Sequence, residues 1–234
     1  MGAIFKREFK SYFITSIGYI FMAIFLVMSG GIFWLFTLDG GAGSFQSFFL
    51  MQMFTFIIII PILTMKLFSE EQKMKTDIAL LTAPVSLTKV VLGKFFAASA
   101  LFFITFIISC IPCGILYIYS TPNTAALITN MIGILFVGMA FIAIGMFISS
   151  LTENQIVAAI VTIFILLFSL VMNFLVSYIS VYAIRFVVDW FSFYTRFAPF
   201  TQGVMSIESI IYFISITAVF IFLTVRIHET RRWK

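Results

Sequence analysis

The sequence predicts an all-α integral membrane protein with six transmembrane helices, and two observations lead to this prediction. Of its 234 residues, 62% are hydrophobic and only 10% are charged, whereas soluble proteins have about 45–50% and about 25%. The apolar residues form long runs without the alternation of an outer-membrane barrel, which favours helices that satisfy their own backbone hydrogen bonds in lipid. We expect residues 1–234 to form one transmembrane domain.

Six apolar runs account for the predicted spans, because each approaches or exceeds the roughly 20 residues that cross a hydrocarbon core about 30 Å thick. Short connectors with Gly, Pro or Asn separate several of them, at 38–46, 120–124 and 151–155. We predict the spans at 17–38, 47–67, 95–119, 125–149, 156–181 and 207–225.

The first residues predict an amphipathic helix over 3–15. Phe5 and Phe9 recur at helical spacing, and Lys6, Arg7 and Lys10 fall on the opposite face. This pattern is typical of a helix that lies in the membrane interface. The alternative interpretation is a helical extension of the first span. We expect no cleaved signal peptide, since a charged stretch precedes an apolar run that is too long for one.

Basic residues near the span ends predict the orientation. Twelve of the 14 Lys and Arg residues fall on one side, and only Arg185 and Arg196 fall on the other. The positive-inside rule therefore places both termini and the loop 68–94 in the cytoplasm, in a multi-pass protein of the cell inner membrane. The net charge of +5 then reports topology and contact with anionic membrane lipids, and we expect no nucleic-acid partner.

Motifs for catalysis are missing from the sequence. It contains no GxxxxGK[ST] phosphate loop, no HExxH and no GxSxG, so we predict no catalytic residue, no metal site and no cofactor bound by this chain. No acidic residue lies in the middle of a predicted span, which argues against an ion-coupled carrier. We interpret Cys110 and Cys113 as small core residues rather than a redox pair, and expect His228 to be solvated in the C-terminal tail.

A polar stripe follows the fifth span, where Ser169, Asn173 and Ser177 recur four residues apart. Two interpretations stay open: the stripe lines a translocation path, or it makes hydrogen bonds between helices. In the fourth span we expect close helix packing at three glycines, Gly133, Gly138 and Gly145.

The loop 68–94 is a polar island between two apolar runs. Met74, Ile78 and Leu81 recur at i, i+4 and i+7, which predicts a short amphipathic helix that Pro84 ends. Such a helix could dock in a groove of a partner or lie on the lipid surface, and these residues alone leave both interpretations open.

The segment FSEEQKMKTDIALLTAPVSLTKVVLGKF resembles the corresponding loop of ABC-2 type transporter permeases. The matching residues are Glu70, Glu71, Thr76, Leu80, Leu81, Thr82, Pro84, Val85, Ser86, Gly93 and Lys94. Lys75 departs from the pattern, because a Gly commonly stands there. KREFKSYFITSIGYIF and FTQGVMSIESIIYFIS resemble the interfacial helix and the approach to the last span in that family, so the resemblance covers the whole chain. The gliding-motility and copper-enzyme maturation permeases are the most similar groups.

The resemblance implies the permease subunit of an ATP-driven ABC transporter, an exporter that works as a homodimer or with a related permease. A separate ABC ATPase subunit would bind ATP and Mg²⁺. The helix around 73–81 would be the coupling helix that seats in the ATPase, and the connector 151–155 would make a second contact. The implied coupling residues are Glu70, Glu71, Lys73, Met74, Thr76, Ile78, Leu80, Leu81, Thr82, Pro84 and Glu153.

For residues 182–206, the resemblance implies short re-entrant helices on the outer side. Arg185, Asp189 and Arg196 would then form an external gate, although anchoring in the membrane interface is an equal interpretation. The alternative function for the whole chain is an ATP-independent six-span channel or membrane scaffold.

Overall fold

The structure is a computed structural model that describes residues 1–38, 45–76, 86–114, 124–176, 190 and 192–232. These residues form helices and contain no strand. Six helices within them are long and apolar enough to cross a membrane, which confirms the prediction of an all-α integral membrane protein. They cover Ile17–Thr37, Gln46–Lys73, Leu87–Gly114, Thr124–Leu151, Gln155–Met172 and Ile207–Arg231.

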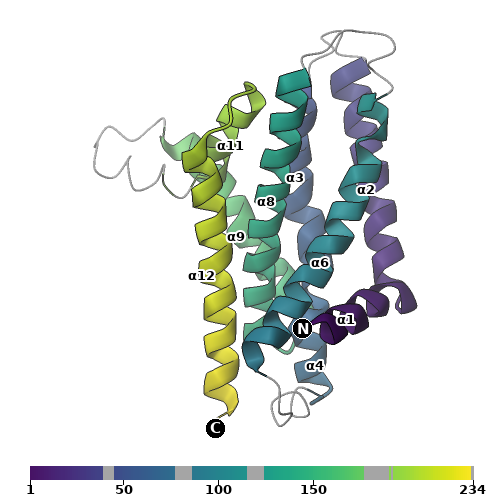
Figure 1. The fold of residues 1–234 in the computed structure, drawn as a ribbon, viewed down its shortest axis with the longest axis vertical. Coiled ribbons are helices and arrows are strands. Elements are labelled where there is room, and N and C mark those ends of the chain that lie inside the picture. The colour runs from purple at the N-terminus through teal and green to yellow at the C-terminus, as the bar shows by residue number, and fades with distance from the viewer. Residues whose placement is uncertain (39–44, 77–85, 115–123, 177–189, 191, 233–234) are drawn as a thin grey trace.

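The long helices lie side by side in a bundle, with α1 across one end and α11 at the other (Figure 1). The helices are α1 (Gly2–Ile14), α2 (Ile17–Phe33) with a π-helical turn η1 (Trp34–Leu38), α3 (Phe45–Thr64), α4 (Lys66–Lys73), α6 (Leu87–Ser109), α8 (Thr124–Leu151), α9 (Gln155–Val176), α11 (Phe193–Thr201) and α12 (Ile207–Arg232). We call the end formed by α1, α4, the start of α6 and the connector 151–155 the charged end. Both termini lie there (Figure 1).

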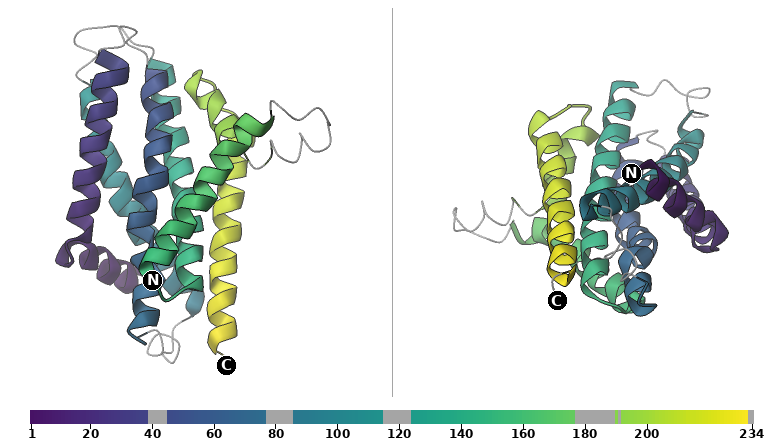
Figure 2. Two further views of the ribbon diagram at one scale, coloured as in Figure 1. Left: turned by 180° about the vertical axis from the view of Figure 1, so that it is seen from behind. Right: turned by 60° about the horizontal axis from the view of Figure 1, so that its bottom comes forward.

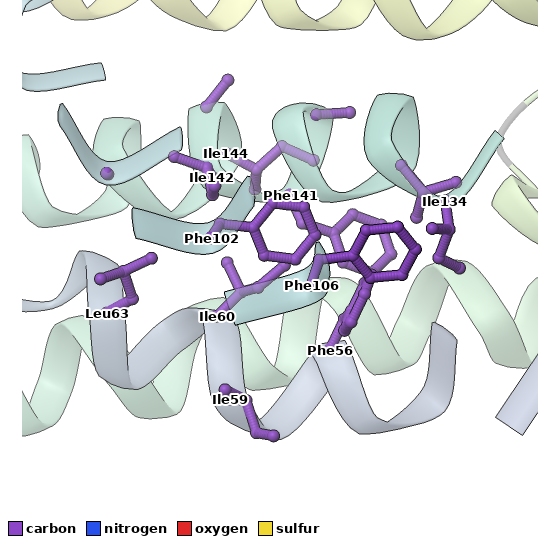
Figure 3. Packing of buried hydrophobic residues seen from close by; sticks show 14 of the residues in the cluster. Phe56, Ile59, Ile60, Leu63, Phe102, Phe106, Ile134, Phe141, Ile142 and Ile144 are labelled. Atoms are coloured by element: carbon purple, nitrogen blue, oxygen red, sulfur yellow. The ribbon is translucent and has the colours of Figure 1, made fainter. Parts of the chain in front are cut away.

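Helix α8 is central to the bundle, since it packs against α3, α6, α9, α11 and α12. Aromatic side chains fill the core between α3, α6 and α8, as Figure 3 shows for Phe56, Phe102, Phe106 and Phe141. The rings of Phe56 and Phe102 meet edge to face with their centroids 5.0 Å apart, a favourable geometry for aromatic pairs. Cys113 is buried in the same core.

Three glycines bring the backbone of α8 close to its neighbours, as the sequence predicted. A Cβ atom on Gly133 would lie 2.6 Å from Cγ of Phe200 in α11. A Cβ on Gly138 would overlap the Phe102 ring of α6, and one on Gly145 would overlap Thr64 of α3. Because the glycines have no side chain, α11, α6 and α3 can each contact α8 closely at these points.

Helix α1 is separate from the first span. It ends at Ile14, the backbone of Thr15 is extended (φ −85°, ψ 140°), and α2 begins at Ile17. The turn is tight, since a Cβ on Gly18 would lie 2.5 Å from the carbonyl oxygen of Tyr12. This break contradicts the alternative of a helix that extends the first span. The aromatic face of α1, with Phe5 and Phe9, is half-buried. Its basic face, with Lys6, Arg7 and Lys10, is exposed. The location of α1 in the membrane interface stays a prediction.

Candidate functional site

Helix α4 carries the paired glutamates of the predicted coupling surface. It follows α3 after a turn at Met65. Glu70 and Glu71 are half-buried, whereas the residues at and beyond its end are exposed, namely Lys73, Met74 and Thr76. The other predicted coupling residues of this loop lie in 77–85, outside the described residues; they are Ile78, Leu80, Leu81, Thr82 and Pro84.

The predicted helix around 73–81 is wrong at its beginning, because α4 ends at Lys73. The Thr76 N–H donates to the Glu71 carbonyl (2.9 Å), and the Lys75 N–H donates to the Gln72 carbonyl (3.1 Å). This pair of bonds is the Schellman motif, which ends a helix on a residue in the left-handed conformation. Lys75 has φ 55°, so it occupies the position that favours Gly. Met74 therefore lies at the end of a helix and not on a continuous amphipathic face.

Helices α1, α4 and α6 meet at Lys94, whose side chain is 2% exposed. Its Nζ donates to Oε1 of Glu71 (2.7 Å), to the carbonyl of Leu67 (2.8 Å) and to Oε2 of Glu8 (3.2 Å). The ammonium also lies 5.1 Å from the ring centroid of Phe68. The ammonium has three N–H donors, and each of them has an acceptor, which a buried charge requires. Lys94 thus ties α6 to both α1 and α4.

The charge of Glu8 is stabilised in this cluster. Burial raises the pKa of its carboxyl, but the Lys94 charge and the hydrogen bonds from Arg7 outweigh burial and lower the pKa overall. The Arg7 guanidinium lies 2.6 Å from Oε1 of Glu8 and 3.7 Å from Oε1 of Glu71, and the hydrogen bond to Glu8 raises the pKa of Arg7. Glu8 is therefore a carboxylate shared by two cations. Sequence reasoning missed it, although it is the one acidic residue in the basic stretch KREFK.

A second buried network joins α4 to the end of α8. Oγ of Ser149 accepts from the backbone N–H groups of Phe68 and Ser69, each at 3.1 Å, and donates to the Met65 carbonyl at 3.0 Å. In return, Ser69 Oγ donates to the Ser149 carbonyl, and Gln72 Nε2 donates to the Ser150 carbonyl, both at 3.0 Å. These carbonyls belong to the last turn of α8, which has no intrahelical donors left for them. The end of α8 therefore supplies a hydrogen-bond acceptor to backbone N–H groups of α4, and side chains of α4 supply donors to the last carbonyls of α8.

The connector 151–155 begins directly after Ser149 and Ser150 of this network. Glu153 is exposed, and the Asn154 side chain accepts from the Ile156 N–H (3.0 Å) at the start of α9. The predicted second contact thus lies three residues from Ser150, whose carbonyl α4 caps. Ser149 and Ser150 were not predicted; their only signal is a pair of small polar residues at the end of an apolar span.

The prediction that His228 is solvated in the C-terminal tail is wrong. Instead of being solvated, it is 6% exposed in α12. Its ring centroid lies 4.3 Å from that of Phe68, and Nδ1 is 2.9 Å from the Thr224 carbonyl. Helix α12 extends beyond the predicted span to the charged end, which carries His228 onto α4.

A polar groove of about 650 Å³ opens between α1 and α4. Tyr12, Glu70 and Glu71 help to line it. The Tyr12 hydroxyl and Oε2 of Glu71 are buried without a hydrogen-bond partner among the described residues, whereas Oε2 of Glu70 lies 3.2 Å from Nζ of Lys66. The groove therefore has a charged lining of both signs, in which Glu70 pairs with Lys66 and Glu71 pairs with Lys94.

At the opposite end, the structure describes part of the predicted path and gate. Ser169 is buried in α9. Asn173 lies in the last turns of that helix, but its side chain and all of Ser177 lie outside the described residues. Arg196 of α11 is 3.7 Å from Glu208 and 5.6 Å from the ring centroid of Tyr212, both in the α12 region. Arg185 and Asp189 also lie outside the described residues.

These observations define a polytopic helical membrane protein in which buried polar contacts hold the charged end together. The family model described as "ABC-2 family transporter protein" matches residues 6–169, which are 164 of the 234 residues, and the chain belongs to this family. It is a membrane permease of an ABC transporter, a transport subunit that is not itself catalytic. No curated protein matches the chain. The matched residues include α4 and the Lys94 cluster.

Proposed function

We propose that this chain is the permease of an ATP-driven exporter, that it forms the translocation path as a dimer, and that it receives energy through α4 from separate ABC ATPase subunits. The observation that carries the proposal is the double attachment of α4. Its outer end is exposed at Lys73 and Met74, while its inner face is bound to the bundle through Ser149 and Lys94.

This attachment suits mechanical transmission. Hydrogen bonds from Ser69 and Gln72 join α4 to α8, and Lys94 joins it to α1 and α6. When ATP draws two ATPase subunits together, a force on the exposed end of α4 would move these helices as one body. Rigid-body movement of packed helices is a common form of switching between two states. The ATP and Mg²⁺ would bind to the partner.

The charged end would face the cytoplasm. It carries the basic residues of α1 and α4 as well as both termini, and cytoplasmic loops have an excess of Lys and Arg. The polar groove beside α4 would then offer its charged lining, which includes Glu70 and Glu71, to complementary groups on the ATPase. Glu153, exposed on the neighbouring connector, would make the second contact.

In the proposed dimer, with a second copy of this chain or with a related permease, the exposed apolar face of α9 would form part of the contact. Ile156, Ile160, Phe164 and Phe168 recur four residues apart and are 47–68% exposed. Helix α9 lies on the outside of the bundle in the view from behind, and α2 lies on the same side (Figure 2). We propose that α2 and α9 meet their counterparts there, and that Ser169, Asn173 and Ser177 of α9 line the path.

The outer segment 182–206 would act as the gate. Arg196 links α11 to α12 by an ion pair and a cation–π contact, so a movement of the bundle would reach α11 through this side chain. Arg185 and Asp189 would complete the gate.

The experiment that tests the proposal is co-expression of the chain with the ABC ATPase encoded beside it, followed by reconstitution in proteoliposomes. We expect the two proteins to co-purify and Met74→Asp or Leu81→Asp to abolish the complex, because each adds a charge to the proposed docking surface. Val204→Asp is the matched control, since Val204 is a similarly exposed apolar residue (56%, against 66% for Met74) at the opposite end.

The alternative, an ATP-independent channel or scaffold, gives a different result. In that case transport or assembly would be intact without the ATPase, and neither substitution in the loop would alter it.

A further inference from the structure

A second groove, of about 710 Å³, lies between α1, α6 and α8 on the surface of the bundle. Its wall is apolar and includes Phe5 of α1, Phe96 and Phe103 of α6, and Leu135 and Met139 of α8. Phe96 and Phe103 are each 46% exposed. Because these two residues are seven positions apart, the groove follows α6 for about two turns, or about 10 Å.

A cationic side chain lies toward one end of this groove. Lys89 precedes Phe96 by seven residues, so it falls near the same face of α6, about 10 Å nearer the charged end. It is exposed and makes no ion pair with any residue that the structure describes. The groove is thus apolar along its length and positively charged near one end.

This combination matches the chemistry of one class of ligand. An acyl chain fills an apolar surface without any polar partner, whereas a phosphate needs cationic donors. We propose that the groove binds one acyl chain of an anionic glycerophospholipid, with the headgroup phosphate at Lys89. The proposal does not depend on the coupling to an ATPase.

A second copy of the chain fits this groove less well. Helix α6, which lines the groove, lies nearer the viewer than α9 in Figure 1, whereas α9 lies in front in the left panel of Figure 2. An apolar helix face in the groove would leave Lys89, which makes no ion pair with any described residue, without a negative charge beside it. A lipid places a negative charge there instead.

A bound lipid would act on α1. On one side, α1 is fixed to α6 through Glu8 and Lys94 and through the contact of Ile4 with Gly93. On the other side, Met1, Gly2 and Phe5 form part of the groove. The acyl chain would therefore close the gap between the start of α1 and the bundle, and the docking of α1 would depend on the lipid.

The test is native mass spectrometry of the delipidated full chain titrated with phosphatidylglycerol, and separately with phosphatidylcholine of the same acyl chains. We expect phosphatidylglycerol to bind at least tenfold more tightly. Lys89→Gln should remove most of this preference, while Lys75→Gln, at another exposed lysine that makes no ion pair with a described residue, should leave it unchanged. Ala100→Trp, which fills the groove, should abolish binding of both lipids.

Phe96→Gln is a milder second variant, because Phe96 is nearly half exposed. It should weaken the binding of both lipids to a similar extent. Equal binding of the two lipids, or no effect of Lys89→Gln, would contradict the proposed preference for an anionic headgroup. Unchanged lipid binding by Ala100→Trp and Phe96→Gln would show that the acyl chain does not bind in the groove. Crosslinks between the Phe103 positions of two copies would assign the groove to a dimer contact and also reject the proposal.

Discussion

Replacing Lys94 with Met tests the role of the buried ion cluster at the charged end. The substitution keeps an unbranched side chain of similar length but removes the ammonium that contacts Glu8, Glu71 and the Leu67 carbonyl. Removal of one partner from a buried ion pair costs about 3–5 kcal/mol, because the other charge is left uncompensated. Here Arg7 still pairs with Glu8 at 2.6 Å but lies 3.7 Å from Glu71. We therefore expect a loss near the lower limit, about 3 kcal/mol.

A double variant separates charge from packing. In Lys94→Met/Glu71→Gln the uncompensated carboxylate is also gone, and the desolvation cost that this recovers is about 1–3 kcal/mol. The double variant should consequently be more stable than Lys94→Met alone. Lys89→Met is the matched control, since Lys89 is exposed on the same helix and substitutions at such sites change stability by about 0.5 kcal/mol or less.

The measurement is unfolding by SDS titration in detergent micelles, followed by circular dichroism. If Lys94→Met unfolds at the same SDS fraction as Lys89→Met, the cluster does not stabilise the charged end. If the double variant is no more stable than Lys94→Met, the loss comes from packing and the electrostatic explanation fails.

Three further predictions concern helix contacts and can be measured with the same titration. Gly138→Ala should destabilise the bundle by about 1–3 kcal/mol, because the new methyl group overlaps a Phe102 ring that is 1% exposed; Gly30→Ala, with no atom within 4 Å of its Cβ, should be neutral or slightly stabilising. Ser149→Ala should cost about 1–3 kcal/mol, because it leaves the buried N–H groups of Phe68 and Ser69 without their acceptor, and Ser149→Thr should recover part of this loss. Lys75→Gly should stabilise by about 1 kcal/mol, since glycine adopts φ 55° without the steric penalty of a side chain; an unchanged or lower midpoint would contradict this account of how α4 ends.

Periodicity and composition predicted the elements whose physics is local. A long apolar run determines a membrane helix almost alone, and the fourth span accordingly appears as α8 (Thr124–Leu151). The glycines of α8 were interpretable for the same reason, since a residue without a side chain in an apolar helix permits close packing wherever its neighbours lie. The amphipathic pattern of α1 likewise indicated which face is half-buried.

The contacts at the charged end could not be predicted in this way, because they join residues far apart in sequence. Lys94 and Glu8 are 86 residues apart, and nothing local to either identifies the other. The end of α4 was misjudged because the spacing of Met74 and Ile78 suits a helix, while the left-handed turn at Lys75 runs against the usual preference for Gly. His228 was misjudged because a polar tail gave no sign that α12 extends to meet Phe68.

The network at Ser149 has a consequence for biosynthesis. Ser69 and Ser149 are 80 residues apart, so α4 leaves the ribosome well before its partner exists. At a synthesis rate of about 5–20 residues per second, the interval is roughly 4–16 s. During that time the side chains of Ser69 and Gln72, which the finished bundle buries, have only water, lipid headgroups or a chaperone as partners. The capture of α4 by the completed end of α8 is therefore a late event of assembly, and it fastens the first half of the chain to the second.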